Sequence, residues 1–116
     1  MIYDGIDNLY YTAGYNLTIF RKYNISGNTT INMAPLPAGV YYGSNLIYDN
    51  GDFIYCIKGQ ATTTVYRYSI KNNSWETLTG VIPAAIGAGG CGVYVQGQHI
   101  YYLKGTVGTV FYRNTL

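Results

Sequence analysis

The acidic residues are the first candidates for chemistry, and the chain has five: Asp4, Asp7, Asp49, Asp52 and Glu76. The first four form two copies of the motif Asp-x-x-Asp, 45 residues apart. Aspartates in tight turns usually accept hydrogen bonds from their own backbone, so we expect both motifs to be structural turns. Glu76 follows the only tryptophan and is expected to be solvated. No pair of carboxylates is then left for general acid–base catalysis.

Histidine and cysteine are equally scarce. His99 is the only histidine, and Cys56 and Cys91 are the only cysteines. A zinc or copper site needs several such ligands close together, and we expect the two cysteines to be buried small hydrophobes in separate strands. The glycine-rich run 87–90 opens no helix, so it is not a phosphate loop. The sequence predicts no catalytic residue, no metal site and no cofactor.

The composition narrows the class of protein. Charged residues make up only 10% of the chain, against about 25% in ordinary domains. The net charge of +2 and seven scattered basic residues give no footprint for nucleic acid. Residues 1–4 show no basic region before an apolar core, so no signal peptide is expected. Pro83 and several glycines interrupt the uncharged run 77–98, so no membrane span is expected either.

The stretch 46–80 is typical of four antiparallel strands: Leu46–Asp49, Phe53–Lys58, Thr63–Ile70 and Ser74–Leu78. Asn50-Gly51 predicts a type I′ hairpin, in which both residues have positive φ, and Asn72-Asn73 predicts another turn. Both alternating sets of side chains in 53–58 are largely apolar. A sheet with one wet face would alternate apolar and polar residues, so we expect other sheets to cover both faces of this one.

This pattern recurs along the chain at spacings of 45 and 46 residues. The matching segments include 7–10 with 52–55, 65–67 with 111–113, and the glycines Gly14, Gly59 and Gly105. Further strands are predicted at Ile2–Asp4, Leu9–Ala13, Thr18–Ile25, Thr29–Met33, Gly89–Val95, His99–Lys104 and Thr109–Arg113. Four-stranded units at this period are typical of a β-propeller. We expect a single all-β domain, 1–116, with units at about 1–42, 43–88 and 89–116.

The order of strand, glycine, tyrosine and tryptophan resembles the kelch family over essentially the whole chain, most strongly over 46–105. The segments that carry it are 54–59, 65–68, 73–78 and 89–97 leading into 99–101. The resemblance implies kelch-like propeller blades and, for most such units, an interaction scaffold rather than an enzyme. The family's glycine doublet is Ala13-Gly14, Lys58-Gly59 and Lys104-Gly105 here, and Thr30 stands where the second unit has Trp75.

Three units are too few for a closed ring, because propellers have roughly 4–8 blades. The incomplete propeller is therefore expected to be either a piece of a longer chain or a self-associating one. Two copies arranged head to tail would supply six blades.

Strand alternation places the loops 15–17, 60–62 and 106–108 at the same end as the long connections 35–42 and 80–87. Six residues at this end are the candidate binding residues: Tyr15, Tyr41, Tyr42, Lys58, Gln60 and Lys104. Tyrosines there would stack on a partner, and lysines and Gln60 would bond its polar groups. The alternative is that these are solvated strand ends and amphipathic tyrosines without a ligand.

The function predicted from these features is a non-enzymatic interaction or structural module. It would bind a protein partner, or self-associate as a homo-oligomer, preferably a dimer, to complete a ring. The low charge and the abundance of tyrosine and glycine resemble surface or virion attachment components. The alternative is a carbohydrate-binding or, less expected, a carbohydrate-modifying propeller. No localisation is indicated.

Overall fold

The protein is described here by a computed structural model that covers residues 1–42, 44–97, 99–106, 108 and 110–115. Over these residues the regular structure consists of three antiparallel sheets of three or four strands, without a helix. None of this part of the chain forms a helix of the length and hydrophobicity needed to cross a membrane. The all-β prediction is confirmed.

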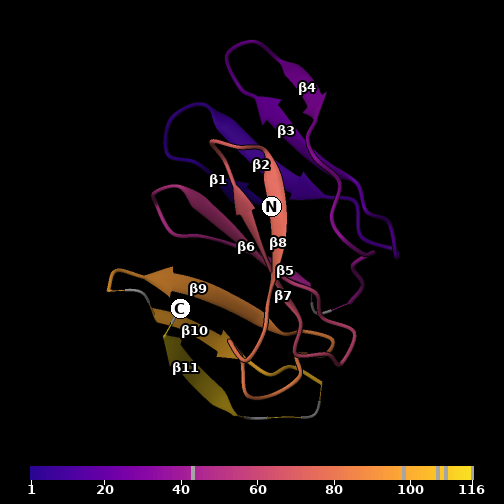
Figure 1. The fold of residues 1–116 in the computed structure, drawn as a ribbon, viewed down its shortest axis with the longest axis vertical. Helices are drawn as coiled ribbons and strands as arrows, with labels where there is room; N and C mark the ends of the chain where they lie inside the picture. Colours follow the sequence, from indigo (N-terminus) through magenta and orange to yellow (C-terminus); the bar gives the residue numbers. More distant parts are fainter. Residues whose placement is uncertain (43, 98, 107, 109, 116) are drawn as a thin grey trace.

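The three sheets follow one another along the chain and are stacked from top to bottom in Figure 1. The first sheet, in the order β1-β2-β3-β4, contains β1 (Ile2–Tyr3), β2 (Asn8–Thr12), β3 (Phe20–Asn24) and β4 (Thr29–Asn32). The second contains β5 (Asn45–Tyr48), β6 (Phe53–Ile57), β7 (Val65–Ser69) and β8 (Ser74–Leu78) in the same order. The third contains β9 (Cys91–Val95), β10 (His99–Leu103) and β11 (Phe111–Thr115), with β10 in the middle.

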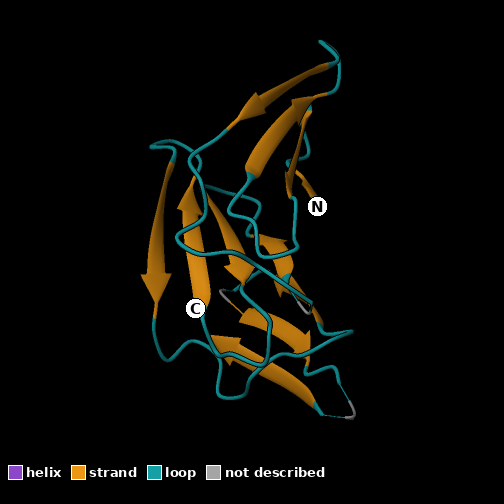
Figure 2. Ribbon diagram, turned by 90° about the vertical axis from the view of Figure 1, so that its right-hand side faces the viewer, coloured by secondary structure: helices purple, strands orange, loops and turns teal. Residues whose placement is uncertain are grey.

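The sequence repeat is also a repeat of strand register. Equivalent cross-strand pairs are Ile2–Tyr10 in the first sheet, Ile47–Tyr55 in the second and Val93–Tyr101 in the third. The first strands of the sheets are neighbours, since β1 contacts β5 and β5 contacts β9. Figure 2 shows the molecule turned by 90°, with loops joining one sheet to the next. Residues 45 or 46 positions apart therefore occupy equivalent places in consecutive sheets.

Two hydrophobic cores lie between the sheets. The first combines Tyr10 and Phe20 of the first sheet with Leu46, Ile54, Cys56, Tyr66 and Tyr68 of the second. The second combines Ile47, Tyr55, Ile57 and Val65 of the second sheet with Ile100 and Tyr102 of the third. The second sheet is thus buried on both faces, as the pattern of 53–58 predicts.

Trp75 fastens the second sheet to the segment that arrives from the first. Its indole Nε1 donates to the carbonyl of Ala34 at 2.9 Å, and the Ala34 N–H donates to Asn73 Oδ1, also at 2.9 Å. The indole ring lies with its centroid 4.9 Å from that of Phe20 and 5.1 Å from that of Tyr68. The tryptophan therefore belongs to the junction between the first and second sheets.

The turn between β5 and β6 is not the predicted type I′ hairpin. Asn50 has a φ of 61°, but Gly51 is not among the residues with positive φ. The reason is Asp49, whose Oδ1 accepts the N–H groups of Gly51 at 2.8 Å and Phe53 at 3.1 Å. The N–H of Asp49 in turn donates to the carbonyl of Phe53. The side chain thus organises a three-residue loop in which Asn50 alone adopts the left-handed conformation.

Asp4 organises the equivalent turn of the first sheet. Its Oδ1 accepts the N–H groups of Ile6, Asp7 and Asn8 at 2.9–3.0 Å, and its Oδ2 accepts Asn8 Nδ2 at 2.7 Å. The structural role predicted for this aspartate is confirmed. Burial opposes ionisation of Asp4, but these hydrogen bonds outweigh it and hold the pKa of the carboxyl below its usual value.

Acidification should therefore weaken the fold through Asp4. A carboxyl whose pKa is lower in the folded state contributes stability that is present above its unfolded pKa of about 3.9 and is lost as the pH falls through the folded value. Asp4→Ala is expected to be less stable than the parent at neutral pH and to lose less stability on acidification. Urea unfolding at several pH values measures this, with the exposed Asp52 replaced by alanine as the control. Parallel pH profiles for the parent and Asp4→Ala would contradict the prediction.

Candidate functional site

Left-handed turns recur at the end of the molecule where the predicted binding residues lie. Each follows the second strand of its sheet and begins with a glycine of positive φ: Gly14, Gly59 or Gly105. Residues other than glycine continue the left-handed path: Tyr15 (φ 51°) and Asn16 (60°), Gln60 (54°) and Ala61 (55°), and Thr106 (53°). The loops 15–17, 60–62 and 106–108 were predicted from the sequence, but their left-handed conformation was not, because the repeated glycine is its only local signal.

The connections between sheets hold these turns in place. Asn16 donates its N–H to the carbonyl of Val40 at 2.9 Å, and Ala61 donates to Ile86 at 3.1 Å. Val40 and Ile86 are fully buried and occupy equivalent places. Left-handed conformation costs about 1–2 kcal/mol per non-glycine residue, so these tertiary bonds must stabilise it. They fix Tyr15 and its equivalent Gln60 at the end of the molecule that carries these turns and the connections between sheets, which we term the loop end.

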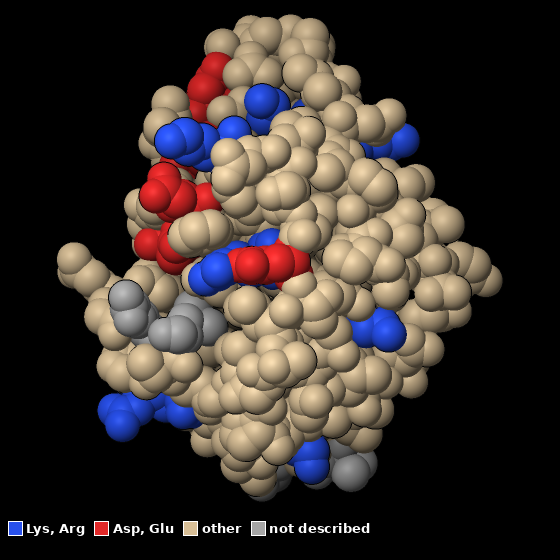
Figure 3. Space-filling model, viewed as in Figure 1, with Lys and Arg blue, Asp and Glu red and all other residues tan. Residues whose placement is uncertain are grey.

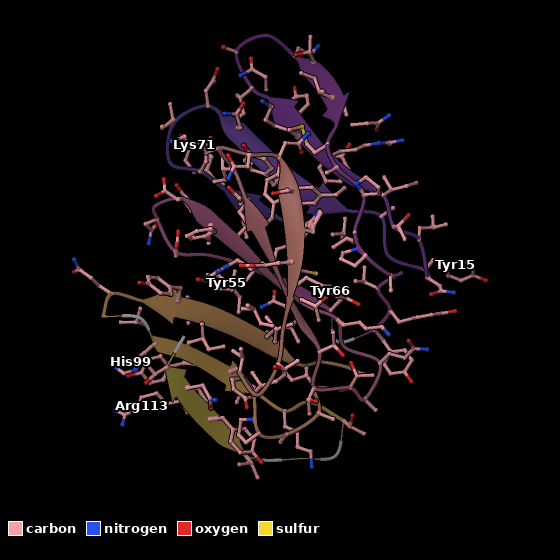
Figure 4. The ribbon with its side chains drawn as sticks, viewed as in Figure 1. Tyr15, Tyr55, Tyr66, Lys71, His99 and Arg113 are labelled. Carbon is pink, nitrogen blue, oxygen red and sulfur yellow. The ribbon has the colours of Figure 1, made fainter. Side chains whose placement is uncertain are left out.

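The structure brings three of the six predicted residues together. The rings of Tyr41 and Tyr42 lie with centroids 6.2 Å apart, and the backbone N–H of Gln60 donates to the carbonyl of Tyr42 at 2.9 Å. The Tyr42 side chain is 57% exposed, whereas Tyr41 and Gln60 are half-buried. Tyr15 is 88% exposed and projects from its own loop at the side of the molecule (Figure 4).

The two predicted lysines are placed differently. Lys104 is half-buried and lines a shallow hollow of about 400 Å³ together with Ala61, Ala85, Gly87, Gly105, Thr106 and Gly108. Lys58 occupies the equivalent strand end, but it does not line this hollow. The hollow lies where the left-handed turns of the second and third units meet the connection between their sheets. Its lining residues are mainly small, and Lys104 is the charged one among them.

The third sheet exposes several large apolar side chains on one face. One face of it packs on the second sheet. The other, which we term the open third-sheet face, contains the apolar side chains Val93, Val95, Tyr101, Leu103 and Phe111, together with the exposed Cys91 opposite Leu103 and the exposed Arg113 opposite Tyr101. Four of these side chains are strongly exposed: Val93 58%, Val95 46%, Leu103 42% and Phe111 60%. Tyr101 packs its ring beside Phe111, with centroids 5.9 Å apart. Within the described residues nothing covers this face.

The cysteines differ because of this open face. Cys56 is buried as predicted, and burial raises the pKa of its thiol to about 12. Cys91, predicted to be buried, is exposed. The prediction was wrong because Cys91 lies opposite Leu103 on the open third-sheet face, which no sheet of the described residues covers. Its equivalent in the second sheet is Asn45, which bonds across to the third sheet through Gly92.

Charged groups are sparse on the surface shown in Figure 3, where acidic side chains gather along the left edge. Arg67 and Glu76 form an ion pair, and the guanidinium lies 4.5 Å from the centroid of the Phe53 ring. Glu76 is exposed as expected, and a surface pair of this kind contributes about 0–1 kcal/mol. Among the residues that the structure describes, no three His, Cys, Asp or Glu side chains gather as metal ligands.

No protein-family model matches the chain, and no curated protein sequence matches it. What the molecule does is therefore inferred from its own surfaces. Two of them stand out: the tyrosine-bearing loop end and the open third-sheet face.

Proposed function

We propose that this chain is a non-enzymatic interaction module, a kelch-like portion of a β-propeller whose function is to associate with protein. Its first partner would be a second copy of itself. Three sheets with one register, and the contacts of β1 with β5 and of β5 with β9, support a propeller-like arrangement. The low charge of the chain suits a structural or attachment component of a surface such as that of a virus particle.

The open third-sheet face is the observation that carries this proposal. The equivalent residues of the second sheet, Ile47, Tyr55, Ile57 and Val65, are at most 5% exposed because the third sheet covers them. Soluble monomers rarely expose a contiguous apolar surface of this kind unless it serves an interaction. Burial of apolar surface is favourable by about 25 cal/mol per Å², so association with another protein surface would stabilise the assembly.

Two copies are the simplest assembly. Each chain contributes three sheets, and propellers contain roughly 4–8, so a pair supplies enough sheets for a ring. Light scattering over a concentration series, with circular dichroism on the same samples, tests the proposal. We expect one β-rich species at twice the 12.8 kDa chain mass that persists on dilution. A well-folded monomer at every concentration would contradict self-association.

Carbohydrate binding is the second candidate, and the exposed tyrosines favour it. Tyr42 lies beside Tyr41 and next to the backbone of Gln60. The three residues therefore provide two aromatic rings and an amide side chain. Aromatic side chains provide large contact area at small entropic cost. A glycan-array signal that is lost in Tyr42→Ala and retained in Tyr101→Ala would support this candidate. Turnover of a sugar would contradict the non-enzymatic assignment.

A further inference from the structure

The first sheet also has an open side. Tyr10 and Phe20 face the second sheet, so the alternation of a strand turns Tyr3, Leu9 and Tyr11 to the opposite side. Tyr3 is 51% exposed, and Leu9 and Tyr11 are half-exposed. We term these three residues the open first-sheet face. The stack of three sheets therefore ends in two different uncovered faces.

The junction between the second and third sheets shows how such faces fit together. From the second sheet, Ile47, Tyr55, Ile57 and Val65 contribute to it. From the third sheet, Tyr94, Ile100, Tyr102 and Tyr112 pack against them, and Ile82 and Ile86 of the connection between the two sheets complete the core. The junction buries Ile57, Val65 and Ile100 completely, each at 0% exposure. Among the described residues no charged side chain is buried in this junction, although the partly exposed Arg67 of the second sheet lies over the ring of Phe53 beside it.

The two open faces repeat the two halves of this junction. The open third-sheet face is equivalent to the second-sheet half of this junction. It has Val93, Tyr101, Leu103 and Phe111 where the second sheet has Ile47, Tyr55, Ile57 and Val65. The open first-sheet face is equivalent to the third-sheet half of the junction. It has Tyr3, Leu9 and Tyr11 where the third sheet has Tyr94, Ile100 and Tyr102. Two of these three positions are identical and the third exchanges leucine for isoleucine, whereas Arg21 stands in the first sheet where the third has Tyr112.

We propose that the open third-sheet face of one copy binds the open first-sheet face of a second copy, in a head-to-tail contact that reproduces the junction between the second and third sheets. The contact is heterologous, so each copy offers two different surfaces, and two such contacts close a ring of two copies. This inference rests on the proposed function and specifies the surfaces through which self-association occurs. A contact between two copies of the same face would have no counterpart within the molecule.

Charge introduced on one face at a time separates the two surfaces. Phe111→Arg alters the open third-sheet face and Tyr3→Arg the open first-sheet face. Each variant alone is expected to self-associate at least about tenfold more weakly, because a charge would be buried at an apolar contact. An equimolar mixture retains one unaltered pair of faces and is expected to form a two-chain species. Tyr15→Arg, the same change at an exposed tyrosine outside both faces, should associate like the parent.

Cys91 provides a second readout that does not depend on mass. It lies on the open third-sheet face, so the proposed contact would cover its thiol. Alkylation by iodoacetamide should be slowed in the parent at concentrations where it associates, and should be fast in Phe111→Arg. Cys56, which is buried and has a raised pKa, serves as the internal control for folding.

The outcomes distinguish this inference from the proposed function. A parent that associates while Phe111→Arg or Tyr3→Arg associates equally well would overturn the head-to-tail contact and leave self-association standing. The head-to-tail contact would also be overturned, with self-association left standing, if Phe111→Arg and Tyr3→Arg were each monomeric and their mixture stayed monomeric. A monomeric parent with Cys91 alkylated rapidly at every concentration would overturn both, and would mean that another protein covers the face. Circular dichroism on each variant shows whether it remains folded.

Discussion

Replacing Phe20 with alanine is expected to lower the free energy of unfolding by about 3–5 kcal/mol. The Phe20 ring is 1% exposed and lies between the first and second sheets. Its centroid is 5.8 Å from that of Tyr10 and 4.8 Å from that of Tyr68. Removing it leaves a cavity between the two sheets, and the surrounding aromatic rings can relax only partly to fill it. Since the free energy of unfolding of a domain is only about 5–15 kcal/mol, this single change should remove a large part of it.

Phe111 is the matched control, because it occupies the position equivalent to Phe20 in the third sheet. It is 60% exposed, so Phe111→Ala should change the stability of the dilute protein by less than about 0.5 kcal/mol. Urea unfolding of both variants at low concentration measures the difference. Similar losses in the two variants would contradict the described burial, either of Phe20 or of Phe111.

The second large effect is expected from Gly105→Ala. Gly105 has a φ of 72°, and an added Cβ would lie 2.6 Å from the carbonyl oxygen of Ala88 and 2.7 Å from that of Gly87, and would also meet the amide nitrogen of Gly90. These are backbone atoms of the connection to the third sheet, which cannot move aside as a side chain could. We expect a loss of about 2–4 kcal/mol, of which about 1 kcal/mol comes from the left-handed conformation and the rest from the clash.

Gly14 separates the two contributions. It occupies the equivalent place in the first unit with a φ of 71°, but an added Cβ there would meet nothing within 4 Å. Gly14→Ala should therefore lose only about 1 kcal/mol, from the backbone conformation alone. Thermal or urea unfolding of both variants tests this. Equal losses would mean that the close approach around Gly105 does not matter for stability.

The strands could be predicted because their signals are local. In Val65–Ser69, for example, β-branched and aromatic residues fill a segment that ends in an Asn-Asn turn, and the same arrangement returns 45 or 46 residues away. Repetition strengthens each signal, since a weak strand such as Ile2–Tyr3 inherits its assignment from the stronger copy at Asn45–Tyr48. The stacking of the sheets followed from the doubly apolar pattern of 53–58.

Burial at the ends of the stack could not be predicted. Cys91 and Phe111 have the residue types and spacing of buried positions, and whether they are buried depends on a neighbouring sheet rather than on their own strand. The prediction of a type I′ hairpin at Asn50-Gly51 was wrong for a different reason. A side-chain carboxylate, that of Asp49, competed with the backbone for the turn amides, and dipeptide preferences do not include such competition.

The loop end was predicted only in outline. Alternation of the strands placed Tyr42 and Gln60 at one end of the molecule, but their contact depends on the path of the connection 35–42. That path follows from hydrogen bonds to left-handed turns, and residues such as Tyr15 and Ala61 adopt this conformation only under tertiary constraint. Propensity alone would have placed all of them in extended or right-handed conformations.

The position of Trp75 gives the protein a built-in optical probe of one junction. The indole is the only one in the chain, and it is surrounded by Phe20, Tyr66 and Tyr68 at the contact of the first two sheets. Its fluorescence emission therefore reports the separation of those two sheets and is blind to the junction with the third. Stacked repeats can unfold one unit at a time. A difference between the melting curves from tryptophan emission and from far-ultraviolet dichroism would then reveal the order in which the sheets come apart.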